Sequence, residues 1–229
     1  MSGGAQHEKR EKDEAVARLA RLDACAVSDA LDSLGLPGAA LGLTALSAPR
    51  RIAGRAVTVE LVEPSAEAAG SGRHLGTAAV DAAGPGDVIV VAHAGRTHVA
   101  GWGGVLSSGA RRNGVEGVVV HGACRDVDEA RELDLPLYAT TGVPVTARGR
   151  VVERAWNVPV DIAGVPVAPG DLVIADASGV VLVPAARAEE VLAKAEAITT
   201  KERAMVERVR AGHPMADVMS ADYETMLDR

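Results

Sequence analysis

A charged pair near the middle of the chain follows a short apolar run and could bind both a metal ion and an anion. Residues 118–120 are three valines, β-branched and too few for a helix, so they predict a buried strand. Arg125 and Asp126 follow where that strand should end. A carboxylate such as that of Asp126 is a hard oxygen ligand suited to a divalent cation, and the planar guanidinium of Arg125 is suited to a carboxylate. Because ligands of open α/β sheets bind outside the carboxyl ends of the strands, we expect a ligand site here.

Two consecutive glycines, Gly103 and Gly104, precede this strand and open a helix predicted over residues 105–113. A glycine turn at this place exposes backbone N–H groups at the N-terminus of a helix, where an anion is favoured. We therefore expect the N–H groups from Gly103 to Leu106, including that of Val105, to bind an anionic part of a ligand.

A structural alternative exists for Asp126 and Glu129. An N-cap carboxylate followed three residues later by a glutamate, ahead of Ala130 and Leu133, is typical of a capping box at a helix N-terminus. That role does not account for the adjacent Arg125 or for the glycines upstream. The two roles can coexist, so the sequence predicts a metal site here and leaves a capping box open.

Composition and charge restrict the class of protein. The chain has 229 residues, 48% of them hydrophobic, which suffices for the core of a single large domain over residues 1–229. The net charge of −7 argues against a nucleic-acid-binding protein that relies on phosphate contacts, but not against a protein partner. The N-terminus is charged where a signal peptide would be apolar, and no apolar run approaches the roughly 18 residues of a membrane span. We expect a cytoplasmic protein with no membrane association.

The remaining pattern mixes strands and helices and predicts an α/β protein. Residues 1–7 are expected to be disordered, and a helix is predicted over residues 8–22. Ser28 and Asp29 are expected to start a second, short helix, where the Asp29 carboxylate either faces the positive end of the helix dipole or belongs to a ligand site. Strands are predicted at residues 55–62, 88–92, 135–139 and 172–175, with several more between residues 143 and 183. The polar segment 186–210 predicts a long helix on the surface or at an interface with a neighbouring subunit.

The spacing of the charged pair resembles the signature of one enzyme family. The signature consists of Gly104, twenty intervening residues, Arg125-Asp126, two further residues and Glu129. Three flanking blocks strengthen the match: SDALDSLG at residues 28–35, PGDVIVV at residues 85–91 and PGDLVIADASGVVLVP at residues 169–184. The family is the class II pyruvate aldolases known as 4-hydroxy-4-methyl-2-oxoglutarate or 4-carboxy-4-hydroxy-2-oxoadipate aldolases, which share their fold with the RraA regulators of ribonuclease E. The resemblance covers about residues 27–212 and implies an α/β/α sandwich of the RraA-like type, related to phosphohistidine swivelling domains.

The resemblance implies a lyase that cleaves 4-hydroxy-2-oxo diacids to pyruvate by a retro-aldol reaction, with oxaloacetate decarboxylation as a related activity. It implies that Asp126 holds Mg²⁺ or Mn²⁺ and that Arg125 binds the 2-oxo oxygen of a small-molecule 2-oxo acid. The N–H groups from Gly103 to Leu106 would hold the pyruvyl carboxylate. Glu129 is expected just outside the direct metal ligands.

Two positions depart from the family pattern. Relatives can carry an acidic residue at the position of Gly104, where it contacts water bound to the metal. Glycine cannot make that contact, so this chain departs from the family in the groups that surround the metal-bound water. His121 stands where relatives commonly carry an aspartate, so it is either a histidine near the site or a structural residue.

The resemblance also bears on assembly and on alternatives. It implies a homo-oligomer, a trimer or a hexamer, in which Glu202 reaches the metal waters of a neighbouring subunit, although helical spacing alone makes Glu202 a solvated residue. One alternative function is that of an RraA-like regulator, which binds and inhibits ribonuclease E. Another is a lyase acting on a different 2-oxo acid, for which His121 and the loop of His74 would be the places to look.

Overall fold

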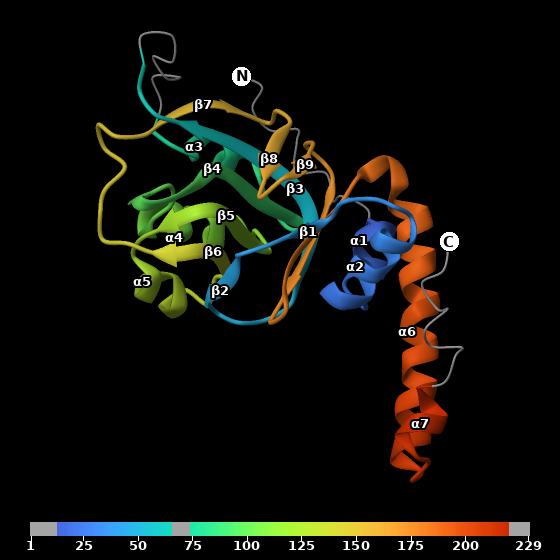
Figure 1. The fold of residues 1–229 in the computed structure, drawn as a ribbon. Coiled ribbons are helices and arrows are strands. Elements are labelled where there is room, and N and C mark those ends of the chain that lie inside the picture. The colour runs from blue at the N-terminus through green and yellow to red at the C-terminus, as the bar shows by residue number, and fades with distance from the viewer. Residues whose placement is uncertain (1–12, 66–73, 220–229) are drawn as a thin grey trace.

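The computed structural model of this chain describes residues 13–65 and 74–219. Within these residues, nine strands form one mixed sheet in the order β1-β11-β10-β3-β4-β5-β6-β2, with β7 paired to β3, and two further strands form a separate hairpin (Figure 1). The sheet strands are β1 Ala39–Ala40, β2 Thr44–Ser47, β3 Ile52–Val62, β4 Asp87–Ala100, β5 Gly117–Cys124, β6 Leu137–Gly142, β7 Val152–Trp156, β10 Leu172–Asp176 and β11 Gly179–Val183. The hairpin is formed by β8 Val160–Ile162 and β9 Val165–Val167.

The centre of the sheet is parallel and apolar. Strands β3, β4, β5 and β6 run parallel to one another, and β10 and β7 flank β3 in the antiparallel sense. The valines at residues 118–120 lie within β5 and are fully buried, as predicted. Parallel strands buried on both faces have such continuous apolar runs rather than an alternation. The predicted strands at residues 88–92 and 172–175 are likewise confirmed as parts of β4 and β10.

Seven helices accompany the sheet in the part of the chain that the structure describes. They are α1 Glu14–Leu19, α2 Ala24–Ser33, α3 Thr77–Ala82, α4 Gly104–Arg112, α5 Val127–Glu132, α6 Ala188–Arg210, which follows a 3₁₀ turn at Ala185–Arg187, and α7 Met215–Val218. One core cluster joins α3, α4 and α5 to β3, β4, β5 and β6, and a second joins α1, α2 and α6 to β10 and β11.

Both helical clusters lie on the same face of the sheet. Ala53 belongs to the cluster of α1, α2 and α6, and Val59 to that of α3, α4 and α5. The two residues are an even number of positions apart on β3, so their side chains point to the same side. The opposite face carries the β8–β9 hairpin, where the expected sandwich had a second layer of helices. The α/β class and the RraA-like type of fold expected from the sequence are confirmed.

The first helices differ from the prediction in where they begin and end. Helix α2 begins at Ala24, because the carboxylate of Asp23 caps it by accepting from the N–H of Ala26 at 2.8 Å. Asp29 therefore lies within the helix, and the prediction that it starts a helix is wrong. The expected disordered start at residues 1–7 and the first residues of the helix predicted over 8–22 lie outside the described residues; in the described part this helix is α1, which ends at Leu19 rather than at residue 22.

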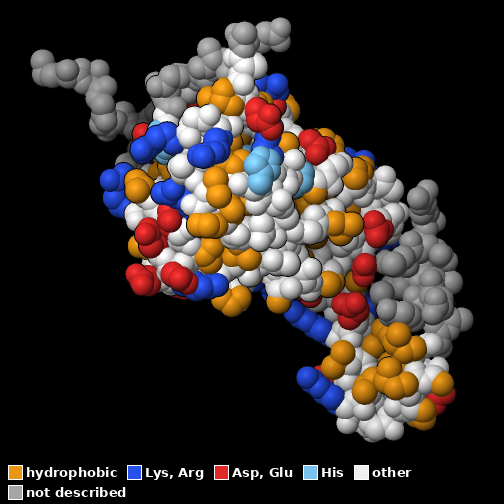
Figure 2. Space-filling model, turned by 60° about the vertical axis from the view of Figure 1, so that its left-hand side comes forward, with side chains coloured by type: hydrophobic (Ala, Val, Ile, Leu, Met, Phe, Trp, Pro, Cys, Tyr) orange, Lys and Arg blue, Asp and Glu red, His pale blue; other side chains and the backbone are white. Residues whose placement is uncertain are grey.

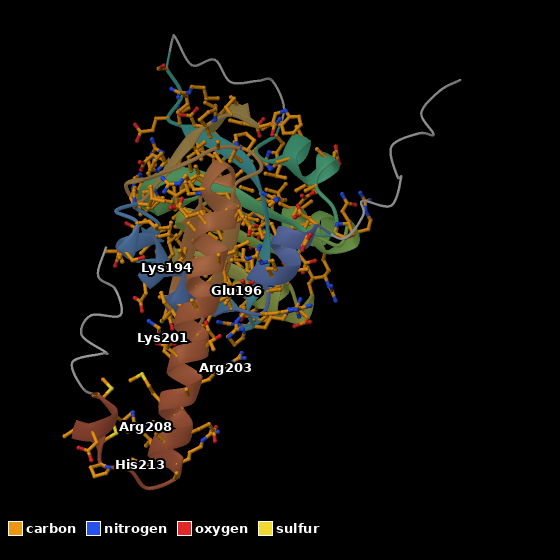
Figure 3. The ribbon with its side chains drawn as sticks, turned by 90° about the vertical axis from the view of Figure 1, so that its right-hand side faces the viewer. Lys194, Glu196, Lys201, Arg203, Arg208 and His213 are labelled. Carbon is orange, nitrogen blue, oxygen red and sulfur yellow. The ribbon has the colours of Figure 1, made fainter. Side chains whose placement is uncertain are left out.

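The long helix predicted at residues 186–210 is confirmed as α6. Its first half packs against the body through Val191, Leu192, Ala195 and Ile198. Its second half and α7 project away from the sheet (Figures 1 and 3). Hydrophobic side chains gather on this projecting end (Figure 2), where Val206, Val209, Met215 and Met219 are each at least 40% exposed. None of the described helices is long and apolar enough to cross a membrane.

Candidate functional site

The Arg125-Asp126 pair directly follows β5, as the sequence predicts. The N–H of Arg125 donates to the carbonyl oxygen of Trp102 at 3.0 Å, which ties the end of β5 to the segment before α4. Asp126 then adopts a left-handed backbone conformation, with φ 58° and ψ 40°. That conformation costs an ordinary residue about 1–2 kcal/mol, and aspartate and asparagine are among the residues that tolerate it. It allows the chain to turn immediately from β5 into α5.

The Asp126 carboxylate is directed at α4 rather than at its own helix. Its Oδ2 accepts from the N–H of Gly104 at 2.9 Å and from Nε–H of Arg125 at 3.1 Å. Asp126 makes no side-chain capping bond to α5. The capping-box interpretation of Asp126 and Glu129 is therefore wrong, because the left-handed backbone at Asp126 turns the carboxylate away from the first turn of α5.

The two glycines lie directly against the acidic side chains that follow β5. Gly103 is extended, with φ −160°, so it is not the turn that the sequence suggested. A Cβ built on Gly103 would lie 3.0 Å from Oδ2 of Asp126. A Cβ built on Gly104 would lie 1.6 Å from Oε2 of Glu129, so the end of the Glu129 side chain would have to move. The carboxylates of Asp126 and Glu129 therefore both approach the first residue of α4, and Glu129 occupies the space that a side chain at position 104 would need.

The N-terminus of α4 retains donors for an anion. The N–H of Gly104 is already engaged by Asp126. The first helical hydrogen bond runs from the N–H of Ser107 to the carbonyl oxygen of Gly103, and within the described residues no acceptor faces the N–H groups of Val105 and Leu106. These are two of the orphan donors that every helix N-terminus carries. Of the groups predicted to bind a carboxylate, those of Val105 and Leu106 remain available.

Buried polar contacts that sequence inspection missed hold this helix start in place. The indole Nε1–H of Trp102 donates to Oγ of Ser107 at 3.0 Å, and that hydroxyl donates to the carbonyl oxygen of Gly103 at 3.2 Å. Both side chains are almost fully buried. The signal available in the sequence was a tryptophan immediately before a glycine pair, in a chain with only two tryptophans.

The ion pair between Arg125 and Asp126 is partly open to solvent, with the two side chains 40% and 30% exposed. Such pairs contribute about 0–1 kcal/mol, so the guanidinium can move to a ligand at little cost. Only Nε of Arg125 is used, and within the described chain its terminal nitrogens make no hydrogen bond. The neighbouring thiol of Cys124 is no competitor as a nucleophile, because burial raises its pKa to about 12.

His121 lies on the other face of the sheet. Its Nδ1 accepts from the N–H of Ala163 beside the β8–β9 hairpin at 3.1 Å, and Gly95 packs against Nε2. Burial lowers the pKa of His121, so the ring is neutral near pH 7. The structure does not bring it to the Arg125-Asp126 pair.

Glu202 is also remote from Asp126 within one chain. It lies on α6 where that helix faces α2, and burial together with the charges of Asp23 and Asp29 raises the pKa of its carboxyl group. His74 is exposed ahead of α3, where its carbonyl oxygen accepts from the hydroxyl of Thr77. Neither side chain belongs to the candidate site of its own subunit.

The donor set at Asp126 fits a cation that keeps most of its water. Across residues 13–65 and 74–219, no group of three or more histidine, cysteine, aspartate or glutamate side chains could enclose a metal ion. This excludes, for those residues, a closed zinc site with four protein ligands. One free carboxylate oxygen, Oδ1 of Asp126, with the Glu129 carboxylate nearby, instead suits magnesium or manganese, which bind proteins through one or two carboxylates and several waters.

Comparison with known proteins places the chain in a family. Residues 24–182 match the Aldolase/RraA profile, described as RraA-like. The protein named "Putative 4-hydroxy-4-methyl-2-oxoglutarate aldolase" of Halalkalibacterium halodurans is 34% identical over 190 residues, covering 81% of this chain and 85% of that protein. Protein DlpA of Legionella pneumophila is 32% identical over 195 residues, covering 85% of this chain, which spans 31% of DlpA. The solved structure of Streptomyces coelicolor RraAS2, "an unusual member of the RNase ES inhibitor RraA protein family", has a TM-score of 0.74 at 30% identity and covers 87% of this chain and 98% of that one. With most of its length matching this profile, the chain belongs to the RraA-like (Aldolase/RraA) family.

Proposed function

We propose that this chain is a divalent-metal-dependent lyase that cleaves 4-hydroxy-2-oxo diacids to pyruvate by a retro-aldol reaction. The observation that carries the proposal is the convergence of Asp126, Arg125 and the open N-terminus of α4 at the end of β5. The carboxylate, the guanidinium and the two free N–H groups are three different functions, and a 2-oxo acid bound to a cation needs all three. The name of the Halalkalibacterium halodurans relative supports the same activity.

Each group has a defined role in the proposed reaction. The N–H groups of Val105 and Leu106 bind the C1 carboxylate at the positive end of the α4 dipole. Arg125 turns one terminal nitrogen toward the 2-oxo oxygen, where negative charge develops as the C3–C4 bond breaks. Asp126 holds the cation, Mg²⁺ or Mn²⁺, which would supply Lewis-acid stabilisation of that charge. The 4-hydroxyl releases one proton as C4 becomes a carbonyl, and the C3 carbon of the enolate takes up one proton to give pyruvate, so the reaction has no net change in protons.

The enolate of pyruvate is also the product of decarboxylating oxaloacetate. The site proposed here makes no contact that distinguishes the two departing groups, because its described donors all face the pyruvyl half of the substrate. Oxaloacetate decarboxylation is therefore proposed as a second activity of the same site.

The test is pyruvate release from a panel of 4-hydroxy-2-oxo diacids and oxaloacetate, measured with a coupled lactate dehydrogenase assay. We expect turnover with magnesium or manganese, loss of at least roughly a hundredfold after chelation, and recovery when the metal is restored. Turnover that survives exhaustive chelation would contradict the metal role, and no pyruvate from any member of the panel would contradict the lyase itself.

We further propose that the chain assembles as a trimer or hexamer in which α6 of one subunit completes the site of the next. Two features support this. Val105, at the start of α4, is 87% exposed although it is apolar, which suits a surface that a neighbour covers. The projecting half of α6 carries Arg203 and Arg208 (Figure 3), which suit an acidic site such as that around Glu129.

If Glu202 acts across the interface, mixing Asp126→Ala subunits with Glu202→Ala subunits will restore activity that neither variant has alone. A mixed ring contains some sites in which both carboxylates are intact. Light scattering gives the subunit number, and Glu207→Ala, an exposed glutamate that pairs with Arg210 on the same helix, is the matched control. A monomer at micromolar concentration defeats the assembly, whereas a fully active Glu202→Ala oligomer defeats only the shared site.

A second candidate function, inhibition of a ribonuclease by protein contact, rests on the likeness to the RraAS2 structure. It needs neither Arg125 nor the free donors of α4. An assay of ribonuclease E cleavage in the presence of this protein separates the two functions, since a regulator would inhibit equally well with its Asp126 carboxylate removed.

A further inference from the structure

Strand β4 makes a wide excursion just before it reaches the candidate site. Its partner residues on β5 show this: Ala92 pairs with His121, Arg96 with Gly122 and Ala100 with Ala123. The chain of β4 therefore runs from Ala92 to Ala100 while β5 advances only from His121 to Ala123. The surplus residues leave the ladder, in the manner of an extended β-bulge.

The side chain of His93 fills the base of this excursion. The imidazole is completely buried. It lies between two glycines: a Cβ on Gly101 would be 2.9 Å from its Cγ, and a Cβ on Gly122 would be 2.6 Å from its Cδ2. Strand β5 and the residue directly after β4 thus lack a side chain where the ring lies, so the ring packs against the backbone of both.

His93 also closes the excursion on itself. Its Nε2–H donates to the carbonyl oxygen of Val99 at 2.8 Å. This bond joins the first residue after the paired Ala92 to the last residue before the paired Ala100. A terminal nitrogen of Arg96 donates to the carbonyl oxygens of His93 and Leu61, at 3.2 and 3.4 Å. The other ring nitrogen, Nδ1, is buried and has no hydrogen-bond partner among the described residues.

The hydrogen bond to Val99 requires a proton on Nε2, and the ring is neutral because it is buried. Burial lowers the pKa of His93 more than the hydrogen bond to Val99 raises it, and the positive charge of Arg96 lowers it further. With Nδ1 unprotonated, Nε2 carries the proton and donates to Val99.

The excursion ends where the candidate site begins. The N–H of Gly101 donates to the carbonyl oxygen of Ala123 at 2.8 Å, and that of Arg125 donates to the carbonyl oxygen of Trp102 at 3.0 Å. These two bonds align the start of α4 with the end of β5. The number of β4 residues that lie outside the ladder before Gly101 therefore determines which residue at the start of α4 faces Asp126.

We infer that His93 is a positioning residue of the candidate site: by closing the β4 excursion between Gly101 and Gly122, it sets the register that brings the N–H of Gly104 to the carboxylate of Asp126. His93 itself contacts neither residue and acts through the two strands. Its structural role is independent of the substrate, and its effect on turnover rests on the proposed function.

The test compares His93→Leu with His93→Gln in the full-length chain by hydrogen–deuterium exchange and mass spectrometry. Leucine fills the slot but cannot donate, whereas the glutamine amide can reach Val99. We expect His93→Leu to raise exchange in peptides covering residues 99–106 and 122–127 by at least roughly tenfold, the effect of one lost buried hydrogen bond on a local opening equilibrium. We expect glutamine to restore most of the protection.

Two controls keep the inference falsifiable. Val173→Ala, in the buried centre of β10, should lower global stability without selectively exposing those peptides. His93→Asn, whose amide is too short for the same bond, replaces the leucine variant if that variant fails to fold. The inference is overturned if these peptides exchange in His93→Leu at the same rate as in wild type. It is also overturned if Val173→Ala raises their exchange as much as His93→Leu does. Because exchange needs no substrate, a protein with no lyase activity would leave this result standing, and in an active protein kcat should fall with leucine and recover with glutamine.

Discussion

Replacing Asp126 with asparagine is expected to abolish metal-dependent turnover while leaving the free energy of unfolding within about 1 kcal/mol of wild type. Asparagine tolerates the left-handed backbone of position 126, and its side-chain oxygen can still accept from the N–H of Gly104. The variant therefore removes little except the negative charge and one metal-binding oxygen. Alanine at the same position removes the charge too, but it adds about 1–2 kcal/mol of backbone strain, so Asp126→Ala should be equally inactive and less stable.

The measurement is kcat/KM for pyruvate release with saturating magnesium, together with urea unfolding of each variant. Asp128→Asn is the matched control, since Asp128 is an exposed carboxylate of the same helix that pairs with Arg131. It should keep wild-type kinetics. Activity of Asp126→Asn close to that of wild type would remove Asp126 from the metal site.

Arg125→Lys is expected to lower kcat/KM by at least roughly tenfold, equivalent to about 1.4 kcal/mol of transition-state stabilisation. Arg125 holds Oδ2 of Asp126 through Nε and leaves its terminal nitrogens for a ligand, so a single side chain serves two partners. A lysine ammonium is one point charge and cannot hold the carboxylate in this way while also reaching the 2-oxo oxygen.

The matched control is Arg131→Lys, which keeps a cation beside Asp128 on the surface of α5. We expect no kinetic change there. If Arg125→Lys keeps the wild-type kcat/KM for every substrate in the panel, the guanidinium does not contact the substrate, and the anion is held by the N-terminus of α4 alone.

The local arrangement of the site could be predicted because it depends on short-range patterns. The β-branched run before Arg125 identified β5, and the glycine pair with a helical segment behind it identified α4. Strand ends of an α/β sheet gather ligand-binding residues irrespective of detail, so the order of elements was enough.

The direction of individual side chains could not be predicted in the same way. The capping-box pattern at Asp126 and Glu129 is met in the sequence, but a single left-handed residue redirects the carboxylate to α4. For His121 a usable signal existed: it is two residues from Val119, so the two share a face of β5 opposite to that of Val118. The role of His93 depends on a register shift between strands, which no single-strand pattern reveals.

The close approach of Glu129 to Gly104 has a consequence for how related sequences can vary. The two positions share one volume, so a side chain at position 104 requires the carboxylate from position 129 to leave it. In this chain glutamate at 129 and glycine at 104 are therefore a matched pair. A side chain at position 104 would displace the end of the exposed Glu129 side chain, so an acidic group on the helix before β5 and the Glu129 carboxylate on the helix after it cannot both occupy this space beside Asp126.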